Sequence, residues 1–310
     1  MTRPSSYRIL ELMRREELNY SLRPRHPERD SVYADYRTRS EQFRSQTEGW
    51  KSISYGESER CSIDWFPSEK PPGAGTEAPQ APAPLLIFIH GGFWRALDHR
   101  LFSFIAQEYV KRGIAVAMLG YQLAPEVRVT DIFEQVCSAV RLLNAQAVEL
   151  NFDPHRICIS GHSAGGQLAA MLSGTPPEQL GGHPFVSVVP VSGVFSLPPL
   201  LLTTVNHDVR MTPDEALSMS PSVLARFYSD QFLVAVGGRE TDGFIGQSRD
   251  FVDVVKGLGI PASLLIVPGR THFDILEELA SPGFELFERV LEQLLTSHLL
   301  PTQETQGRLS

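Results

Sequence analysis

The chain is poor in cysteine, in long apolar runs and in clustered positive charge. Its three cysteines, Cys61, Cys137 and Cys158, are widely spaced and odd in number, which argues against a disulfide framework. No apolar stretch approaches the roughly 20 residues of a membrane-spanning helix. The segment Met1–Tyr20 lacks the uninterrupted apolar core of a signal peptide. We therefore expect a cytoplasmic protein that does not enter a membrane.

The charge balance excludes further classes of partner. The formal net charge is −8 over 310 residues, and no basic cluster with interleaved aromatics is present, which argues against nucleic acid and anionic membranes. The apolar fraction of 42% and the charged fraction of 21% are those of ordinary globular proteins. We expect a small-molecule substrate as the partner, with a homodimer left open as the state of assembly.

The chain divides into a polar helical segment and one α/β domain. Residues 1–50 are expected to form a helical cap, residues 51–300 the main domain, and residues 301–310 a tail. At the start of the main domain, two short β-like runs within 52–66 predict an antiparallel hairpin. The stretch Pro67–Pro84 is rich in proline, glycine and alanine, which predicts an exposed loop.

Apolar strand patterns then alternate with amphipathic helix patterns. The predicted strands cover residues 85–89, 114–119, 157–160, 186–191, 232–236 and 263–267, and the predicted helices lie near 99–112, 130–150, 164–174, 243–258 and 283–297. Continuous apolar strands separated by helices indicate a mostly parallel sheet covered on both faces. Residues 197–228 break the alternation, and an insertion there would lie above the carboxyl ends of the strands, where ligands bind in open α/β sheets.

Two glycine-rich segments follow predicted strands and carry the strongest functional signal. Residues 161–165, Gly-His-Ser-Ala-Gly, form a G-x-S-x-G elbow, in which a sharp strand-to-helix turn presents the hydroxyl of Ser163 as a nucleophile. Residues 90–94, His-Gly-Gly-Phe-Trp, follow the strand pattern at 85–89. Right-handed crossovers would bring both turns together at one edge of the sheet. The pair predicts a serine hydrolase.

The glycine-rich loop supplies the rest of the predicted oxyanion site. A tetrahedral oxyanion is held by backbone N–H groups, which we assign to Ala164 and to Gly92 and Phe93. Trp94 is predicted to bind substrate as part of an aromatic pocket, with packing beneath the loop as the open alternative. His90 is expected to brace the loop, and His162 to be structural.

A serine nucleophile in this fold needs an acid and then a histidine later in the chain. His272 comes just after the predicted strand 263–267, which is where the base belongs. Glu240 and Asp242 both follow the strand 232–236, and either carboxylate could orient the imidazole. We favour Glu240, because Asp242 suits the start of the next helix better.

These motifs resemble the kynurenine formamidase (arylformamidase) family of the α/β-hydrolase superfamily, whose loop reads H-G-G-x-W. The stretches Glu17–Ser21 and Gly237–Glu240 are also similar, and the resemblance spans nearly the whole chain. It implies an α/β-hydrolase fold, with helices on both faces of a mostly parallel sheet. It further implies hydrolysis of N-formyl-L-kynurenine to kynurenine and formate, with no metal and no organic cofactor.

Two other functions stay open at this point. A general carboxylesterase of the hormone-sensitive-lipase type would use the same serine machinery on short-chain esters. A non-catalytic binding protein on a hydrolase scaffold is the alternative from another class, because a fold does not fix a function. A protein of that kind is expected to have lost the serine, the acid or the histidine, whereas this sequence has a candidate for each of them.

Overall fold

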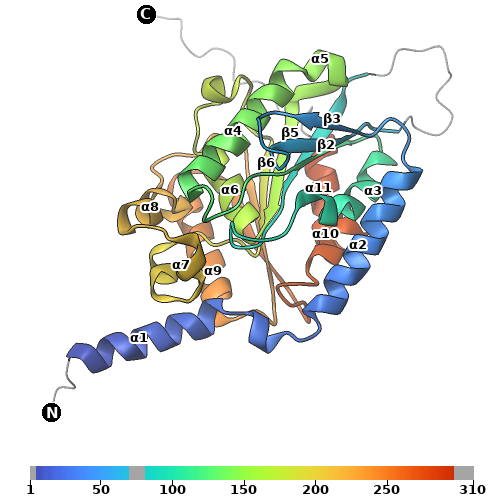
Figure 1. Cartoon of the computed structure of the whole chain (residues 1–310). Coiled ribbons are helices and arrows are strands. Elements are labelled where there is room, and N and C mark those ends of the chain that lie inside the picture. Colours follow the sequence, from blue (N-terminus) through green and yellow to red (C-terminus); the bar gives the residue numbers. More distant parts are fainter. Residues whose placement is uncertain (1–4, 70–80, 297–310) are drawn as a thin grey trace, which may run out of the picture.

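The structure, a computed structural model, describes residues 5–69 and 81–296 (Figure 1). Within these residues, one sheet has the strand order β1-β2-β4-β3-β5-β6-β7-β8. The strands are β1 (Lys51–Ser54), β2 (Ser62–Phe66), β3 (Ala83–Ile89), β4 (Ala115–Leu119), β5 (Phe152–His162), β6 (Ser187–Val191), β7 (Phe232–Gly237) and β8 (Ala262–Val267). The strands from β4 to β8 run parallel, and the predicted hairpin of β1 and β2 extends one edge in antiparallel pairing.

Helices cover both faces of the sheet because side chains alternate along each buried strand. In β3, Leu85, Ile87 and Ile89 join one core, and Leu86 and Phe88 join the other. The first core is completed by α4 (Val129–Ala145), α6 (Ala164–Ser173) and α9 (Asp242–Gly257), and the second by α2 (Arg29–Gln46), α3 (Ala106–Val110), α10 (Leu276–Ala280) and α11 (Glu285–Thr296). This arrangement confirms the predicted α/β fold class.

Several predicted elements differ in detail. The region 99–112 folds as a 3-10 helix, η2 (His99–Ile105), followed by α3. Residues 102–105 are all buried. This stretch therefore lacks the alternation of a buried and an exposed face that is typical of an amphipathic α-helix. The helix near 130–150 breaks into α4 and α5 (Ala147–Leu150), which ends at Asn151 in the left-handed region. The short helix α10 was not predicted, because five residues give too little periodicity.

The predicted loop and tail fall partly or wholly outside the described residues. β3 begins at Ala83, so Pro84 lies in a strand and not in the loop as predicted. Residues 70–80 of the loop and the whole of 301–310 are not described. None of the helices in the described part of the chain is long and apolar enough to cross a membrane.

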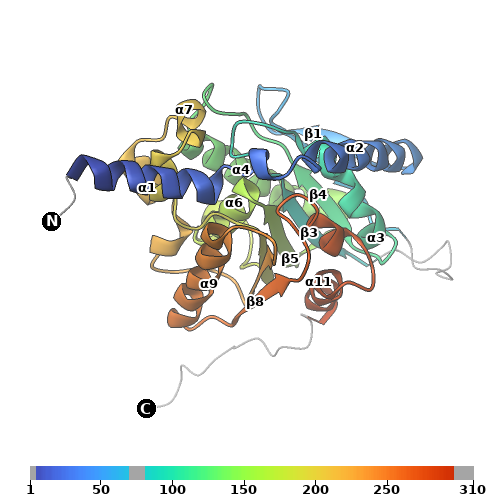
Figure 2. The same ribbon diagram turned by 90° about the horizontal axis from the view of Figure 1, so that it is seen from below.

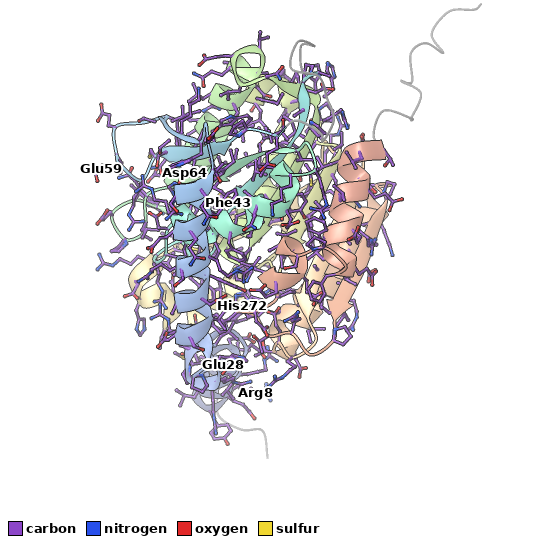
Figure 3. All side chains as sticks on the ribbon, turned by 90° about the vertical axis from the view of Figure 1, so that its right-hand side faces the viewer. Arg8, Glu28, Phe43, Glu59, Asp64 and His272 are labelled. Atoms are coloured by element: carbon purple, nitrogen blue, oxygen red, sulfur yellow. The ribbon has the colours of Figure 1, made fainter. Side chains whose placement is uncertain are left out.

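The N-terminal segment reaches around the carboxyl ends of the strands. Helix α1 (Ser5–Tyr20) contacts η4 (Pro198–Leu202) and α9, and Figure 2 shows it projecting beyond the main body. Helix α2 packs on the second core, and Figure 3 places His272 near the start of α2, which Glu28 precedes. The connection between α1 and α2 therefore lies over the edge of the sheet where the two predicted turns meet.

The predicted insertion lies beside this connection. It contains η4, α7 (Val205–Val209), α8 (Pro213–Ser218) and η5 (Pro221–Val223). Its contact with the N-terminal segment is polar: Thr204 donates its backbone N–H to Glu17 Oε2 over 2.7 Å and its hydroxyl to Glu17 Oε1 over 2.6 Å. The two non-sheet segments thus meet above the strand ends.

Candidate active site

Ser163 occupies a strained turn between β5 and α6. Its backbone has φ 55° and ψ −117°, values that a non-glycine residue adopts only when its surroundings impose them. The turn is tight against β3: a Cβ on Gly165 would lie 2.0 Å from the carbonyl oxygen of Ile89. Glycine is therefore required at that position, and the elbow lies next to the loop that follows β3.

The loop after β3 has three successive residues with positive φ, namely Gly92, Phe93 and Trp94 at 112°, 49° and 57°. Ala124 donates its N–H to the Trp94 carbonyl over 2.8 Å and holds the loop in this conformation. Within residues 5–69 and 81–296, no protein acceptor is found for the backbone N–H groups of Gly92, Phe93 or Ala164. These donors are consequently available to a ligand.

His90 lies beneath the same loop and is fully buried. Its ring stacks on Tyr121 with centroids 4.1 Å apart, and its Nδ1 lies 2.7 Å from the Gly91 carbonyl oxygen. Burial lowers the pKa of His90 to about 3, so the ring is neutral and Nδ1–H donates to that carbonyl. His90 therefore stabilises the loop through this hydrogen bond and the stacking contact, as predicted.

The carboxylate that contacts His272 is that of Glu240. Glu240 Oε2 lies 2.7 Å from His272 Nδ1, while Oε1 accepts the Gly237 N–H over 2.8 Å and the hydroxyl of Ser192. Asp242, the other acid that the sequence left open, is exposed in the first turn of α9. Ser192 was missed by the sequence analysis, although a polar residue directly after the strand β6 was the available signal.

The main chain of His272 is fixed by His162. The Nε2–H of His162 donates to the His272 carbonyl oxygen over 2.8 Å, and the two rings lie 4.7 Å apart. Burial, with the nearby His272 ring as a smaller cause, holds the pKa of His162 well below the ordinary value for histidine. His162 is thus a neutral buried donor.

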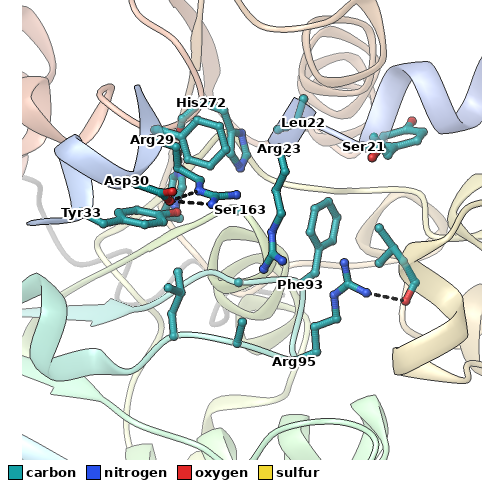
Figure 4. Close-up of a pocket in the computed structure, with 17 residues that line it drawn as sticks. Ser21, Leu22, Arg23, Arg29, Asp30, Tyr33, Phe93, Arg95, Ser163 and His272 are labelled. Carbon is teal, nitrogen blue, oxygen red and sulfur yellow. Dashed lines mark hydrogen bonds and ion pairs between the residues drawn. The ribbon is translucent and has the colours of Figure 1, made fainter. Parts of the chain in front are cut away.

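Ser163 and His272 line a common pocket of about 240 Å³ (Figure 4). Its walls come from the connection between α1 and α2, from the loop after β3, and from the insertion through Val205. The lining also includes Tyr20, Arg23, Arg29, Asp30, Tyr33, Phe93, Arg95 and Phe273. The N-terminal contribution was not predicted, beyond the similarity noted at Glu17–Ser21.

The prediction that Trp94 binds substrate is wrong. The indole is fully buried and does not line the pocket, whereas Phe93 does. Trp94 Nε1 donates to Gln167 Oε1 of α6 over 3.0 Å. The positive φ of Trp94 turns its side chain beneath the loop, which is the packing alternative left open by the sequence.

Tyr20 forms the wall of the pocket next to α9. Its hydroxyl accepts a hydrogen bond from Gln247 Nε2, and its ring packs edge-on against Phe244 with centroids 5.6 Å apart. Burial raises the pKa of Tyr20 to about 12, so the phenol keeps its proton. Because Gln247 supplies the donor, the Tyr20 hydroxyl can donate its own proton to a ligand.

No group of three or more potential metal ligands (His, Cys, Asp or Glu) is found within residues 5–69 and 81–296. The polar groups around Ser163 are instead backbone donors, an imidazole and a buried carboxylate. This is the donor set of nucleophilic acyl transfer, in which a hydroxyl attacks a carbonyl.

Comparison with known proteins identifies similar chains. The BD-FAE family model matches residues 76–183. A kynurenine formamidase of Danio rerio is 30% identical over 265 residues, which cover 82% of this chain and 85% of that protein. The kynurenine formamidase of Drosophila melanogaster is 29% identical, with 74% and 76% covered.

Solved structures give the same fold. A candidate thioesterase from Silicibacter sp. TM1040 superposes with a TM-score of 0.72 at 33% identity, covering 84% of this chain and 92% of that one. Esterase B of Lactobacillus rhamnosis superposes with a TM-score of 0.64 at 20% identity, covering 86% and 92%. With the site geometry and the extended similarity to the Danio rerio protein, this chain belongs to the kynurenine formamidase family of α/β-hydrolases.

Proposed function

We propose that this chain hydrolyses N-formyl-L-kynurenine to kynurenine and formate, with Ser163 as nucleophile, His272 as base and Glu240 as orienting acid. The observation that carries the proposal is the 2.7 Å contact between His272 Nδ1 and Glu240 Oε2, beside a pocket shared with Ser163. The relatives named kynurenine formamidase support this substrate.

The first half of the reaction forms a formyl-enzyme. His272 accepts the proton of the Ser163 hydroxyl while the oxygen attacks the formyl carbonyl. The N–H groups of Ala164, Gly92 and Phe93 hold the resulting oxyanion, and each such donor contributes about 3–4 kcal/mol to transition-state stabilisation. Protonated His272 then gives its proton to the arylamine nitrogen, and the C–N bond breaks.

The second half releases formate. Water gives a proton to His272 and attacks the formyl ester, and the oxyanion is held by the same donors. Collapse returns the proton to Ser163. Glu240 fixes the tautomer of His272 and stabilises the imidazolium in both halves. Its two contacts through Oε1 keep it in place for both halves.

Turnover of N-formyl-L-kynurenine by purified protein tests the proposal. We expect kynurenine to form with a kcat/KM of about 10⁴ M⁻¹s⁻¹ or more, and Ser163→Ala to lower kcat by roughly 10⁴-fold or more. Near-normal turnover by that variant would exclude Ser163 as nucleophile. Failure of a fluorophosphonate to label the wild-type serine would favour a non-catalytic protein.

The second candidate is a carboxylesterase or thioesterase activity. The observation that favours it is the 33% identity with the candidate thioesterase, whose chain is covered to 92%. Brisk hydrolysis of a short p-nitrophenyl ester, with negligible turnover of the formamide, would select this alternative. The serine machinery is the same in both cases.

A cytoplasmic location is part of the proposal. It is supported by the three cysteines, which are all free and buried. Unpaired thiols of this kind are typical of proteins in a reducing compartment.

A further inference from the structure

The pocket that holds Ser163 is positively charged in an acidic protein. Its charged lining residues are Arg23, Arg29, Arg95 and Asp30; with Asp208, the partner of Arg95, they leave a surplus of one positive charge, whereas the whole chain carries −8. A positive cleft in an acidic molecule attracts anionic ligands in preference to neutral ones.

Two of the three arginines already have a carboxylate partner. Arg29 donates from Nε and Nη2 to Asp30 Oδ1 over 3.0 and 2.6 Å. Arg95 pairs with Asp208 and is only 17% exposed. These guanidinium groups are held in the wall by acids of the protein itself.

Arg23 has no such partner. Within the described residues, its guanidinium makes no ion pair and no hydrogen bond with the protein. It lies on the 3-10 turn η1 (Arg23–Arg25), and in Figure 4 its side chain runs down from that turn toward Phe93 and Arg95. A guanidinium presents a planar set of donors that matches a carboxylate in bidentate geometry.

We propose that Arg23 binds the carboxylate of an amino-acid side arm on the substrate and so selects anionic arylformamides over neutral ones. The inference rests on the proposed function, because the substrate there carries a carboxylate remote from its formamide. Arg23 touches the substrate away from the reacting carbonyl. It therefore acts on substrate binding, whereas the chemical step stays with Ser163 and His272.

The test compares two substrates that differ only in this charge, namely N-formyl-L-kynurenine and its α-carboxamide. For the wild type we expect kcat/KM to be roughly tenfold or more higher for the acid. Arg23→Gln is expected to remove this preference through a higher KM for the acid, with the carboxamide unaffected. Arg23→Lys keeps the positive charge but lacks the planar, bidentate donors of the guanidinium, so it should recover part of the preference.

Arg25→Gln is the matched control, because Arg25 lies in the same turn, is exposed and does not line the pocket. It should leave both substrates unaffected. An equal loss on both substrates in Arg23→Gln, or an unchanged preference, would overturn the proposal. Equal wild-type turnover of acid and carboxamide would overturn it while leaving the formamidase activity intact. Turnover of neither would instead refute the proposed function.

Discussion

Glu240 and His272 connect the ends of two neighbouring strands, β7 and β8, through a 2.7 Å contact between Oε2 and Nδ1. Glu240→Gln keeps the shape of the side chain but removes the charge that stabilises the imidazolium. We expect kcat on N-formyl-L-kynurenine to fall by roughly 10³- to 10⁴-fold with a similar KM. Steady-state kinetics of Asp242→Asn provide the control, since the exposed Asp242 should be dispensable. A larger loss in Asp242→Asn would contradict this assignment.

Trp94 is buried, whereas its neighbour Phe93 lines the pocket. Substitutions at the two positions should therefore separate an effect on stability from an effect on substrate binding. Trp94→Phe leaves the buried Gln167 Oε1 without its donor, and we expect the free energy of unfolding to fall by about 1–3 kcal/mol with KM nearly unchanged. Phe93→Ala should instead raise KM, because Phe93 lines the pocket. Urea denaturation and steady-state kinetics on both variants measure the two effects. A large rise of KM in Trp94→Phe alone would restore the indole to the binding site.

Gly165 and Gly246 are both helical glycines, but only one of them has room for a side chain. Gly165→Ala places a methyl group 2.0 Å from the Ile89 carbonyl oxygen, so we expect loss of soluble folded protein or a drop in stability of several kcal/mol. Gly246→Ala in α9 meets nothing within 4 Å and should stabilise by about 0.5–1 kcal/mol. Thermal unfolding of both variants checks the pair. Equal melting temperatures would show that the elbow can move away from β3.

His162 makes folding stability depend on pH. Its pKa in the folded state is well below the ordinary value of 6.5, because of burial, so the unfolded chain binds a proton that the folded chain does not. The contribution of the neutral, buried His162 to folding stability is therefore fully present above pH 6.5 and is lost as the pH falls below that value. His162→Gln should make stability less steep in pH by about 1.4 kcal/mol per pH unit between pH 6 and 5. Urea denaturation at both pH values measures the slope, and an unchanged slope would mean that His162 is protonated in the fold.

The fold was predictable where the signal was local. The elbow at Ser163, the loop at Gly92 and the position of His272 each follow an apolar strand, and parallel strands bring such ends together. The choice of Glu240 over Asp242 depended on how well Asp242 suits the start of a helix, and the structure places Asp242 in the first turn of α9 and Glu240 against His272.

The side of the loop on which Trp94 lies depends on three successive positive φ values, which residue type does not encode. The lining from Tyr20 to Tyr33 arises from how two polar helices pack onto the body. Such packing is set by contacts between distant segments, as when the Tyr36 hydroxyl donates to the Phe273 carbonyl oxygen over 3.1 Å. No periodicity within residues 5–46 reveals that contact.

The pocket wall between α1 and α2 has a consequence for how this enzyme can diversify. The reacting groups sit on turns of the sheet, while Tyr20, Arg23 and Tyr33 come from a segment that precedes every strand. This part of the pocket lining and the turns that carry Ser163 and His272 thus lie in separate stretches of the chain. Exchanging residues 5–46 for the equivalent stretch of a relative would therefore change that part of the lining and leave the turns of Ser163, Glu240 and His272 as they are.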